Sequence, residues 1–419
     1  MATGVDMDHF DVAVVGSGPA GATAAGTLAS RGVSVALIDK SHFPRDKACG
    51  DLIGPRAVSL LQQLGVELPA DVTRVGDMYL DSPRGRRLTM AASPGLSYPG
   101  HGVLMKRSQF DALLHDAAIS SGATPVYERV ETVTILDSKY QITTTNGTIT
   151  ADTVIGADGA NSQVARSLNL IDDDAALYGF ALRGYVEASN DKAIISLFDR
   201  SAIGGDRTGI FPGYGWIFPT SDGVCNFGVG IGVGSDKKAA STVTKALDYY
   251  KKFLKDKGVI LGDLEPGGRR LGGWLRMGAS GSSLGSSRVL LIGDAAGLVN
   301  PLQGEGIFAA IDSGYRAALA IVDRPSSPLF PYAIEMKERH LTYLEATATL
   351  QRLALKYPSL FSRASELLCS PLLPRAIGSS WGLFYNDLME GAQNNSSKRI
   401  AKVLHSSVRA LRLAETFAA

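Results

Sequence analysis

The sequence is poor in cysteine and has almost no net charge. Its three cysteines, Cys49, Cys225 and Cys369, are spread over 419 residues, which is too sparse for a disulfide framework or a zinc-binding pattern. Such a chain suits a reducing compartment. Lys and Arg number 42 against 41 Asp and Glu, whereas a nucleic-acid-binding domain usually carries a strong basic excess. The sequence therefore predicts no metal site and no nucleic-acid partner.

Long apolar runs are also missing. No uninterrupted run reaches the ~18 residues that a membrane-spanning helix needs, because charged residues interrupt the two best candidates, Val289–Val299 and Gly306–Val322. The first Lys or Arg is Arg31, whereas a secretory signal begins with such basic residues before its apolar run. We therefore expect a cytoplasmic protein.

The start of the chain has the pattern of a β-strand, an α-helix and a second β-strand. The apolar stretches Phe10–Val15 and Val33–Ile38 are typical of buried parallel strands, and the small residues of Ala20–Ser30 suit a helix between them. Further strands are expected at Thr132–Ile135, Tyr140–Thr150, Thr153–Ala157 and Val289–Ile292. The stretch Tyr140–Thr150 has a turn at Asn146-Gly147, and the last two strands are apolar. A short strand leading into a helix is expected at Leu104–Ser121.

Two other stretches, Asp77–Pro99 and Tyr178–Gly234, are rich in short strand-like segments and predict a second, mostly antiparallel sheet inserted into the first domain. From about Ser326 onward the pattern is helical. The expected class is α/β, with a discontinuous Rossmann-type domain (residues 8–76, 104–170 and 285–325). A substrate domain (residues 77–103 and 171–284) and a C-terminal helical region (residues 326–419) complete the expected architecture.

A glycine-rich turn follows the first predicted strand. In Gly16-Ser17-Gly18-Pro19-Ala20-Gly21 the first glycine permits a tight turn, the second lets a diphosphate approach the backbone, and the third allows close packing of helix and strand. The N–H groups at the helix start favour the diphosphate. Asp39 ends the second strand about twenty residues later, where a carboxylate binds a ribose. Together these features predict a dinucleotide site.

Two later motifs carry a resemblance to a known superfamily. Ile155-Gly156-Ala157-Asp158-Gly159 ends one strand, and Leu290–Gly297, with Asp294, ends another before Pro301–Ile307. With them the chain resembles the p-hydroxybenzoate hydroxylase-like FAD superfamily from Phe10 to about Val322. The resemblance implies that Asp294 binds the ribityl chain and that Gly304–Ile307 lies against the flavin N1–C2=O edge. A helix start there would stabilise the negative charge of reduced flavin.

The resemblance also places Arg107 near the flavin phosphates and Val130 at the adenine. The full set of residues expected at the cofactor is Gly16, Gly18, Pro19, Ala20, Gly21, Asp39, Lys40, Cys49, Gly50, Leu52, Arg107, Val130, Asp158, Gly159, Asp294, Gly304, Gly306 and Ile307.

Two further segments resemble the geranylgeranyl reductase family. Arg45–Asp51, followed by Pro55–Val58, is similar to the Cys-Gly-Asp loop that passes beside the isoalloxazine in that family. Tyr214-Gly215-Trp216-Ile217-Phe218-Pro219 is similar to its aromatic-x-Trp-x-Phe-Pro segment, which implies that Tyr214, Trp216, Phe218 and Pro219 line the substrate pocket. Aromatic rings give large apolar contact area at low entropic cost. The resemblance implies an FAD-dependent reductase that saturates double bonds of a prenyl lipid.

The glycines Gly228, Gly230 and Gly232 share one face of the strand-like stretch Val224–Val233. Glycines in a strand often mark close approach of a ligand or backbone, so we expect a bare sheet face with room for a prenyl chain or the flavin. Alternatively, the neighbouring aromatic residues fill the core beneath the sheet. The reaction needs a proton for the second alkene carbon, and Cys49 and Tyr214 are the candidate acids.

Partners and alternatives stay open. In Ser397–Phe417 basic residues face one side and apolar residues the other, which favours peripheral contact with the inner face of the membrane. The alternative is a terminal helix packed on its own domain.

The electron donor is NAD(P)H or a reductase or ferredoxin partner. The rival functions are an aromatic monooxygenase or a halogenase of the same fold, and a flavin-stabilised lipid-binding protein without turnover. A halogenase normally shows Trp-x-Trp-x-Ile-Pro, where this chain has Tyr214 and Phe218.

Overall fold

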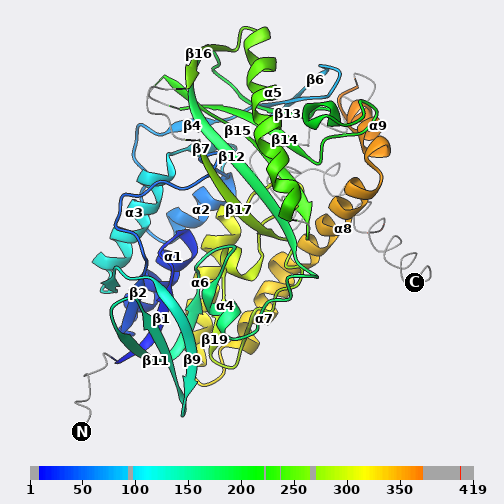
Figure 1. Ribbon diagram of the computed structural model, residues 1–419. Coiled ribbons are helices and arrows are strands. Elements are labelled where there is room, and N and C mark those ends of the chain that lie inside the picture. Colours follow the sequence, from blue (N-terminus) through cyan, green and yellow to red (C-terminus); the bar gives the residue numbers. More distant parts are fainter. Residues whose placement is uncertain are drawn as a thin grey trace.

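Two large β-sheets with flanking helices form the molecule (Figure 1). The computed structural model describes residues 9–92, 98–220, 223–235, 237–264 and 270–370, together with Ser406.

The first sheet contains the predicted parallel strands. Its path runs β18-β19-β11-β1-β2-β8, with β1 parallel to both β11 and β2, and the β9–β10 hairpin extends from β11. The strands are β1 (His9–Val15), β2 (Val35–Ile38), β8 (Thr124–Val126), β9 (Val130–Leu136), β10 (Lys139–Thr144), β11 (Thr148–Gly156), β18 (Gly285–Ser286) and β19 (Val289–Leu291). All residues of Val12–Val15 and Val35–Ile38 are buried, as expected of parallel strands covered on both faces.

Helices of the first part pack around this sheet. Helix α1 contacts both α3 and α6, and α2 also packs on α6. These helices are α1 (Pro19–Ala29), α2 (Pro55–Gln63), α3 (Arg107–Ser120), α4 (Gln163–Ser167) and α6 (Ile307–Asp323). A Cβ on Gly314 of α6 would lie 2.2 Å from the Ala20 carbonyl oxygen. Glycine at this position therefore allows α6 to approach the start of α1.

The second sheet is mostly antiparallel and follows the path β16-β12-β15-β14-β13-β5-β6, with β17 also paired to β12. Its strands are β5 (Met78–Asp81), β6 (Arg87–Met90), β12 (Leu177–Ala188), β13 (Ala193–Ser196), β14 (Gly213–Pro219), β15 (Val224–Gly234), β16 (Ile260–Leu264) and β17 (Leu271–Met277). Helix α5 (Val243–Asp256) lies along this sheet (Figure 1). It packs its apolar face on Phe227, Val229 and Ile231 of β15.

A small three-stranded sheet, β3 (Leu52–Ile53), β7 (Gly102–Leu104) and β4 (Thr73–Val75), contributes Leu52 and Ile53 just after the Cys-Gly-Asp loop. The C-terminal helices follow the side of the molecule: α7 (Leu329–Met336), a π-helical turn η4 (Lys337–Leu341), α8 (Thr342–Lys356) and α9 (Pro358–Leu368) (Figure 1).

The expected fold class is confirmed: an α/β part built on parallel strands, a mostly antiparallel second sheet and a helical region towards the C-terminus. The predicted strand–helix–strand start corresponds to β1, α1 and β2, and the predicted turn at Asn146-Gly147 joins β10 to β11. The basic amphipathic segment Ser397–Phe417 lies outside the described residues, Ser406 excepted. In the described part of the chain, no helix combines the length and the apolar character needed to cross a bilayer.

Candidate functional site

The glycine-rich turn joins β1 to α1 through very close packing. Gly16 has a φ of +102°, and a Cβ there would lie 2.4 Å from the Ala157 carbonyl oxygen. A Cβ on Gly21 would lie 1.8 Å from the Gly16 carbonyl oxygen. Gly18 caps α1 without a side-chain hydrogen bond, so the N–H groups of the first turn face a site that a diphosphate can occupy.

Asp39 ends β2 beside this turn. Its Oδ2 accepts a 2.8 Å hydrogen bond from the Ser17 N–H and its Oδ1 a 2.9 Å bond from the Ser41 N–H. Each carboxylate oxygen keeps a lone pair for a further donor. Arg45 Nη2 lies 3.9 Å from the same carboxylate. The carboxylate is thus held in place at the position expected for a ribose-binding acid.

Arg107 begins α3 and is buried, with 4% of its surface exposed. Its Nε and Nη2 donate to the two carboxylate oxygens of Asp111 at 2.6 and 2.7 Å. Burial favours the neutral acid, but the Arg107 charge outweighs it and holds the pKa of Asp111 below its usual value. Arg107 is therefore a fixed cation, and it lines a cavity that extends from the glycine-rich turn to the second sheet.

Asp158 follows β11, and its side chain binds backbone N–H groups of the same chain segment. Its carboxylate accepts hydrogen bonds from the Ser162 hydroxyl and from the N–H groups of Gln163 and Val164, at the start of α4. Burial raises the pKa of this carboxyl group above its ordinary value. Asp158 thus fixes the loop that carries Gly159, and Gly159 itself lines the cavity.

One cavity of about 330 Å³ connects the glycine-rich turn with the second sheet. It is lined by most of the residues predicted at the cofactor and substrate sites, namely Gly18, Pro19, Ala20, Cys49, Gly50, Leu52, Arg107, Gly159, Tyr214, Trp216, Phe218, Asp294, Gly304, Gly306 and Ile307. The fold therefore brings segments from α1, β3, β14 and α6 to one site.

The start of α6 forms the end wall of the cofactor part of the cavity. Gly304 has a φ of +66°, and a Cβ on Gly306 would lie 3.6 Å from Oδ1 of Asp294. Asp294 therefore lies next to the first turn of α6. The N-cap residue of α6 is Gly306, which has no side chain to cap the first turn. One N–H of that turn, from Phe308, donates a 2.9 Å hydrogen bond to the carboxylate of Glu305.

Tyr214, Trp216 and Phe218 alternate along β14 and form an aromatic wall of the cavity. A Cβ on Gly50 would lie 3.1 Å from the Phe218 ring and 3.3 Å from Nε1 of Trp216, so the Cys-Gly-Asp loop passes directly over these rings. The Tyr214 hydroxyl donates to the Gln303 carbonyl oxygen. Burial, and then the neighbouring Cys49 and Glu305, raise its pKa above the usual value.

The glycine face of β15 is only partly bare. A Cβ on Gly228 would lie 2.2 Å from the Trp216 ring, and one on Gly232 would lie 1.8 Å from Nε2 of Gln351. At Gly230 the nearest atom would be 3.7 Å away, on Trp216. The glycines therefore make room for the Trp216 and Gln351 side chains, and open space remains at Gly230.

A buried hydrogen-bond network anchors the Cys-Gly-Asp loop to the second sheet. Asp51 adopts a φ of +63°, and its Oδ2 accepts from the Tyr185 hydroxyl at 2.5 Å and from Asn226 Nδ2 at 2.7 Å. Asn226 also donates to the Cys49 carbonyl oxygen at 2.8 Å and accepts from Trp216 Nε1 at 2.9 Å. The loop and the aromatic wall are thus positioned by the same amide.

The far arm of the cavity is apolar. It is lined by Leu197, Ile210, Phe211, Pro212, Ala354, Leu355 and Phe361. Gln351 of α8 is the polar exception in this arm: it is 6% exposed, and its Oε1 is buried with no hydrogen-bond partner. Such a lining suits an apolar ligand.

Several predicted residues lie away from the cavity lining. Gly16, Gly21 and Asp39 support the turn behind it, Lys40 is exposed, Val130 is buried at the start of β9, and Pro219 lies at the end of β14. The sequence motifs did not predict a role for four residues of the site: Asp51, Asn226, Glu305 and Gln351. Asp51 and Glu305 stand inside the Arg45–Asp51 and Pro301–Ile307 motifs, whereas Asn226 and Gln351 carry no sequence signal. In the part of the chain that the structure describes, no cluster of His, Cys, Asp and Glu side chains could hold a metal ion.

The residues present fit FAD. A Cβ on Gly159 would meet no atom within 4 Å, and one on Gly18 would meet only Arg45 at 3.9 Å, so both glycines border open space beside the first turn of α1. The Asp39 carboxylate lies at the ribose end, beside the turn and outside the cavity lining, and Asp294 lies at the start of α6. From Asp39 past the first turn of α1 to α6, the donors and acceptors thus match ribose, diphosphate and flavin in that order.

Comparisons with known proteins agree with this fit. Residues 9–323 match the FAD binding domain family. The chain is 35% identical over 338 residues to menaquinone reductase of Mycobacterium tuberculosis (strain ATCC 25618 / H37Rv), covering 77% of this chain and 79% of that protein. It is 32% identical over 355 residues to chloroplastic geranylgeranyl diphosphate reductase of Nicotiana tabacum, covering 76% of this chain and 67% of that protein.

Solved structures share the fold. A geranylgeranyl bacteriochlorophyll reductase-like protein from Thermoplasma acidophilum superposes with a TM-score of 0.72 at 20% identity, covering 95% of this chain and 100% of that one. Flavin-dependent halogenases also have this fold. From the family match and the curated relatives, the chain belongs to the FAD binding domain family and is an FAD-dependent oxidoreductase related to the geranylgeranyl reductases.

Proposed function

We propose that this protein reduces C=C double bonds in the isoprenoid chain of a prenyl lipid, of the geranylgeranyl or polyprenyl-quinone type. Its relatives named menaquinone reductase and geranylgeranyl diphosphate reductase support this substrate class. The observation that carries the proposal is the single cavity that joins the FAD cradle to an apolar arm between the second sheet and the C-terminal helices.

The residues of the chain have distinct roles in this proposal. When bound and reduced, FAD supplies a hydride to one alkene carbon. The residues predicted at the cofactor hold it between the first turns of α1 and α6. Trp216 and Phe218 orient the prenyl chain and exclude water. Cys49 and Tyr214, both in the cavity wall, are our candidates to hold the proton for the second alkene carbon. The Tyr214 proton is directed at the Gln303 carbonyl oxygen, so Tyr214 would have to rotate to donate it.

The test is anaerobic turnover by the FAD-loaded protein. The holoenzyme is reduced with dithionite and offered menaquinone, geranylgeranyl diphosphate or a digeranylgeranyl ether lipid, and mass spectrometry looks for the gain of two hydrogens. Oxidised holoenzyme is the control. No gain with any of these prenyl lipids, in protein that holds reduced FAD, would contradict the proposal.

A matched pair of variants locates the reaction. Gly230→Val adds a side chain where the nearest atom is 3.7 Å from an added Cβ, so it should narrow the cavity while FAD stays bound. Gly147→Val, in the β10–β11 turn with no atom within 4 Å of an added Cβ, is the control. Full turnover by Gly230→Val would place the prenyl chain elsewhere.

The alternative, an aromatic monooxygenase or a halogenase of the same fold, predicts phenol-stimulated oxidation of NADPH with oxygen or halogen transfer to the ring. The sequence relatives above 30% identity that define the family here are named reductases, which favours the prenyl reductase.

Further parts of the proposal concern organisation and location. We propose that residues 8–76, 104–170 and 285–325 form the FAD-binding domain, residues 77–103 and 171–284 the substrate domain, and residues 326–419 the helical region. A lipid substrate and the basic segment Ser397–Phe417 support peripheral contact with the inner face of the membrane, which flotation with anionic liposomes tests. The electron donor is NAD(P)H or a ferredoxin.

A further inference from the structure

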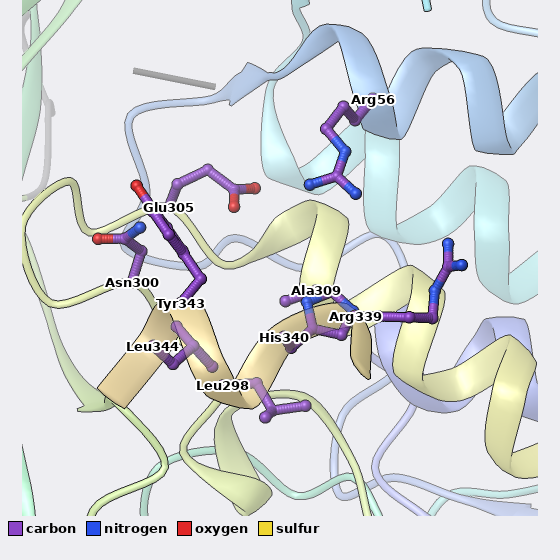
Figure 2. Close-up of a pocket in the computed structure, with 9 residues that line it drawn as sticks. All are labelled: Arg56, Leu298, Asn300, Glu305, Ala309, Arg339, His340, Tyr343 and Leu344. Atoms are coloured by element: carbon purple, nitrogen blue, oxygen red, sulfur yellow. The ribbon is translucent and has the colours of Figure 1, made fainter. Parts of the chain in front are cut away.

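A second, much smaller cavity lies behind the loop that leads into α6 (Figure 2). Its volume is about 10 Å³, which is close to the space that one water molecule needs. It is lined mainly by polar and ionisable side chains: Arg56, Leu298, Asn300, Glu305, Ala309, Arg339, His340, Tyr343 and Leu344. A polar cavity of this size can hold a hydrogen-bonded water.

Glu305 is the residue that lines both this small cavity and the large one. Its Oε1 accepts the Phe308 N–H at 2.9 Å, and its backbone carbonyl accepts the Asn300 N–H at 2.8 Å. The carboxylate therefore occupies the positive end of α6, to which the motif assigns the N1–C2=O edge of the flavin. Two negative charges at one helix end repel each other.

The titratable and charged groups around Glu305 come from several elements, and they include Arg339 of η4. On the side of the small cavity are Arg56 of α2, whose guanidinium lies 4.0 Å from the centre of the Phe308 ring, His340 of η4 and Tyr343 of α8. In Figure 2 the carboxylate of Glu305 and the guanidinium of Arg56 point toward one another. On the side of the large cavity are Tyr214 of β14 and Asp294.

Burial raises the pKa of Glu305, and the Phe308 N–H and the charges of Arg56 and His340 only partly offset this effect. A second negative charge on the other side of the carboxyl group would raise the pKa further.

A series of ionisable groups leads away from the small cavity. His340 Nε2 lies 2.7 Å from Oδ2 of Asp312, and Arg339 donates to the same oxygen at 2.9 Å. Arg316 lies 3.4 Å from Asp312 and 3.9 Å from Glu335, whose side chain is 44% exposed. Arginine keeps its proton, so Arg316 and Arg339 hold these carboxylates in place and do not pass a proton on. The Arg339 side chain lines the small cavity and is 28% exposed, and it does not line the large cavity. Water can therefore bring a proton to the small cavity on this side without entering the apolar slot.

We propose that Glu305 takes up the compensating proton when bound FAD is reduced, and that the small cavity supplies that proton from the side away from the prenyl slot. For each electron pair that an external donor delivers to FAD, a carboxylate oxygen of Glu305 binds one proton and becomes the neutral acid. It releases the proton when the electrons leave with the product. The inference rests on the FAD site of the proposed function but not on the identity of the lipid.

Proton uptake has a defined pH window. Below the pKa of Glu305 with oxidised FAD, the acid is neutral in both redox states. Above its pKa with reduced FAD, it is ionised in both. Between the two values, reduction draws in one extra proton, which adds about 30 mV per pH unit to the slope of a two-electron midpoint potential.

The experiment measures the FAD midpoint potential against pH with indicator dyes, without any lipid substrate. Between the two pKa values of Glu305, the midpoint potential of the wild-type holoenzyme should change with pH by about 30 mV per pH unit more than that of Glu305→Gln. The Glu305→Gln potential should lack this extra slope at every pH. Gln keeps an oxygen that can accept the Phe308 N–H, so a purely helix-capping role would leave the slope unchanged. Glu366→Gln, whose carboxylate is bonded to Ser82 and Arg84 away from both cavities, is the matched control and should follow the wild type.

An infrared difference spectrum of the wild type gives an independent readout. Reduction should produce the C=O stretch of a protonated carboxyl group, and that band should be missing in Glu305→Gln. Parallel slopes for wild type and Glu305→Gln, or a wild-type spectrum without the band, overturn the inference. If Glu305→Gln fails to retain FAD, the wild-type spectrum decides. A wild-type protein that binds no FAD would instead overturn the cofactor assignment.

Discussion

Replacing Asn226 by Leu should release the Cys-Gly-Asp loop from the second sheet. The Asn226 amide is 0% exposed and makes three hydrogen bonds, to Asp51, to the Cys49 carbonyl oxygen and from Trp216. Leu is branched at Cγ like Asn but has no polar atoms, so most of the cost comes from buried groups left without partners, about 1–3 kcal/mol each. Two groups lose their partner, the Cys49 carbonyl oxygen and Trp216 Nε1, while Asp51 Oδ2 keeps the Tyr185 hydroxyl. The expected loss is on the order of 2–6 kcal/mol in the free energy of unfolding, a large fraction of the roughly 5–15 kcal/mol typical of a folded domain.

The loss should depend on pH because Asp51 is titratable. Burial raises the pKa of Asp51, and the hydrogen bonds from Tyr185 and Asn226 pull it back down. Without the Asn226 amide the native-state pKa rises further. An acid with a raised native pKa stabilises the fold below its unfolded-state pKa, and that contribution disappears as pH rises through the native value. The destabilisation by Asn226→Leu should therefore be larger at about pH 8 than at about pH 5.

Urea unfolding followed by tryptophan fluorescence measures both effects. Asn190→Leu is the matched control. The Asn190 side-chain amide donates to the nearby Lys192 carbonyl oxygen, and surface changes of this kind stay within about 0.5 kcal/mol. A destabilisation below about 1 kcal/mol, or one that does not change with pH, would refute the reasoning about this network.

Two other substitutions test the cavity. Gly21→Ala should abolish FAD retention, since the added Cβ would lie 1.8 Å from the Gly16 carbonyl oxygen; flavin absorbance after gel filtration measures this, and Gly147→Ala, with open space around its Cβ, should stay yellow. Gln351→Met replaces a buried amide whose Oε1 has no partner by an apolar side chain of similar size, so it should raise the stability of the ligand-free protein by about 1 kcal/mol. A lower melting temperature for Gln351→Met would mean that the amide is satisfied in solution.

The nucleotide end of the site could be predicted from the sequence because its chemistry is local. Gly16, Gly18 and Gly21 act within one turn, and Asp39 is placed by the length of a single helix and strand. Strands β1 and β2 could also be predicted from the sequence, because a parallel strand that is buried on both faces requires a continuous apolar run.

The anchoring of the substrate end could not be predicted in the same way. Asp51 and Asn226 are 175 residues apart, and no local pattern indicates that a loop and a distant strand share one amide. Gln351 occupies an ordinary position in a helix, and its place in the apolar arm is decided by how α8 docks on β15. The role of Asp158 at the start of α4 also depends on a turn of the backbone that the motif alone does not specify.

How closely the Trp216 ring packs on the second sheet depends on Gly228, which has no side chain and does not line the cavity. Gly228 lets the Trp216 indole lie flat on β15, where a methyl group would come within 2.2 Å of the ring. A larger residue there would push the indole toward Gly50, whose added Cβ would already lie 3.3 Å from Trp216 Nε1. The position of the aromatic wall therefore depends on a residue that does not line the cavity, and a single change at Gly228 would alter the shape of the cavity while every lining residue kept its identity.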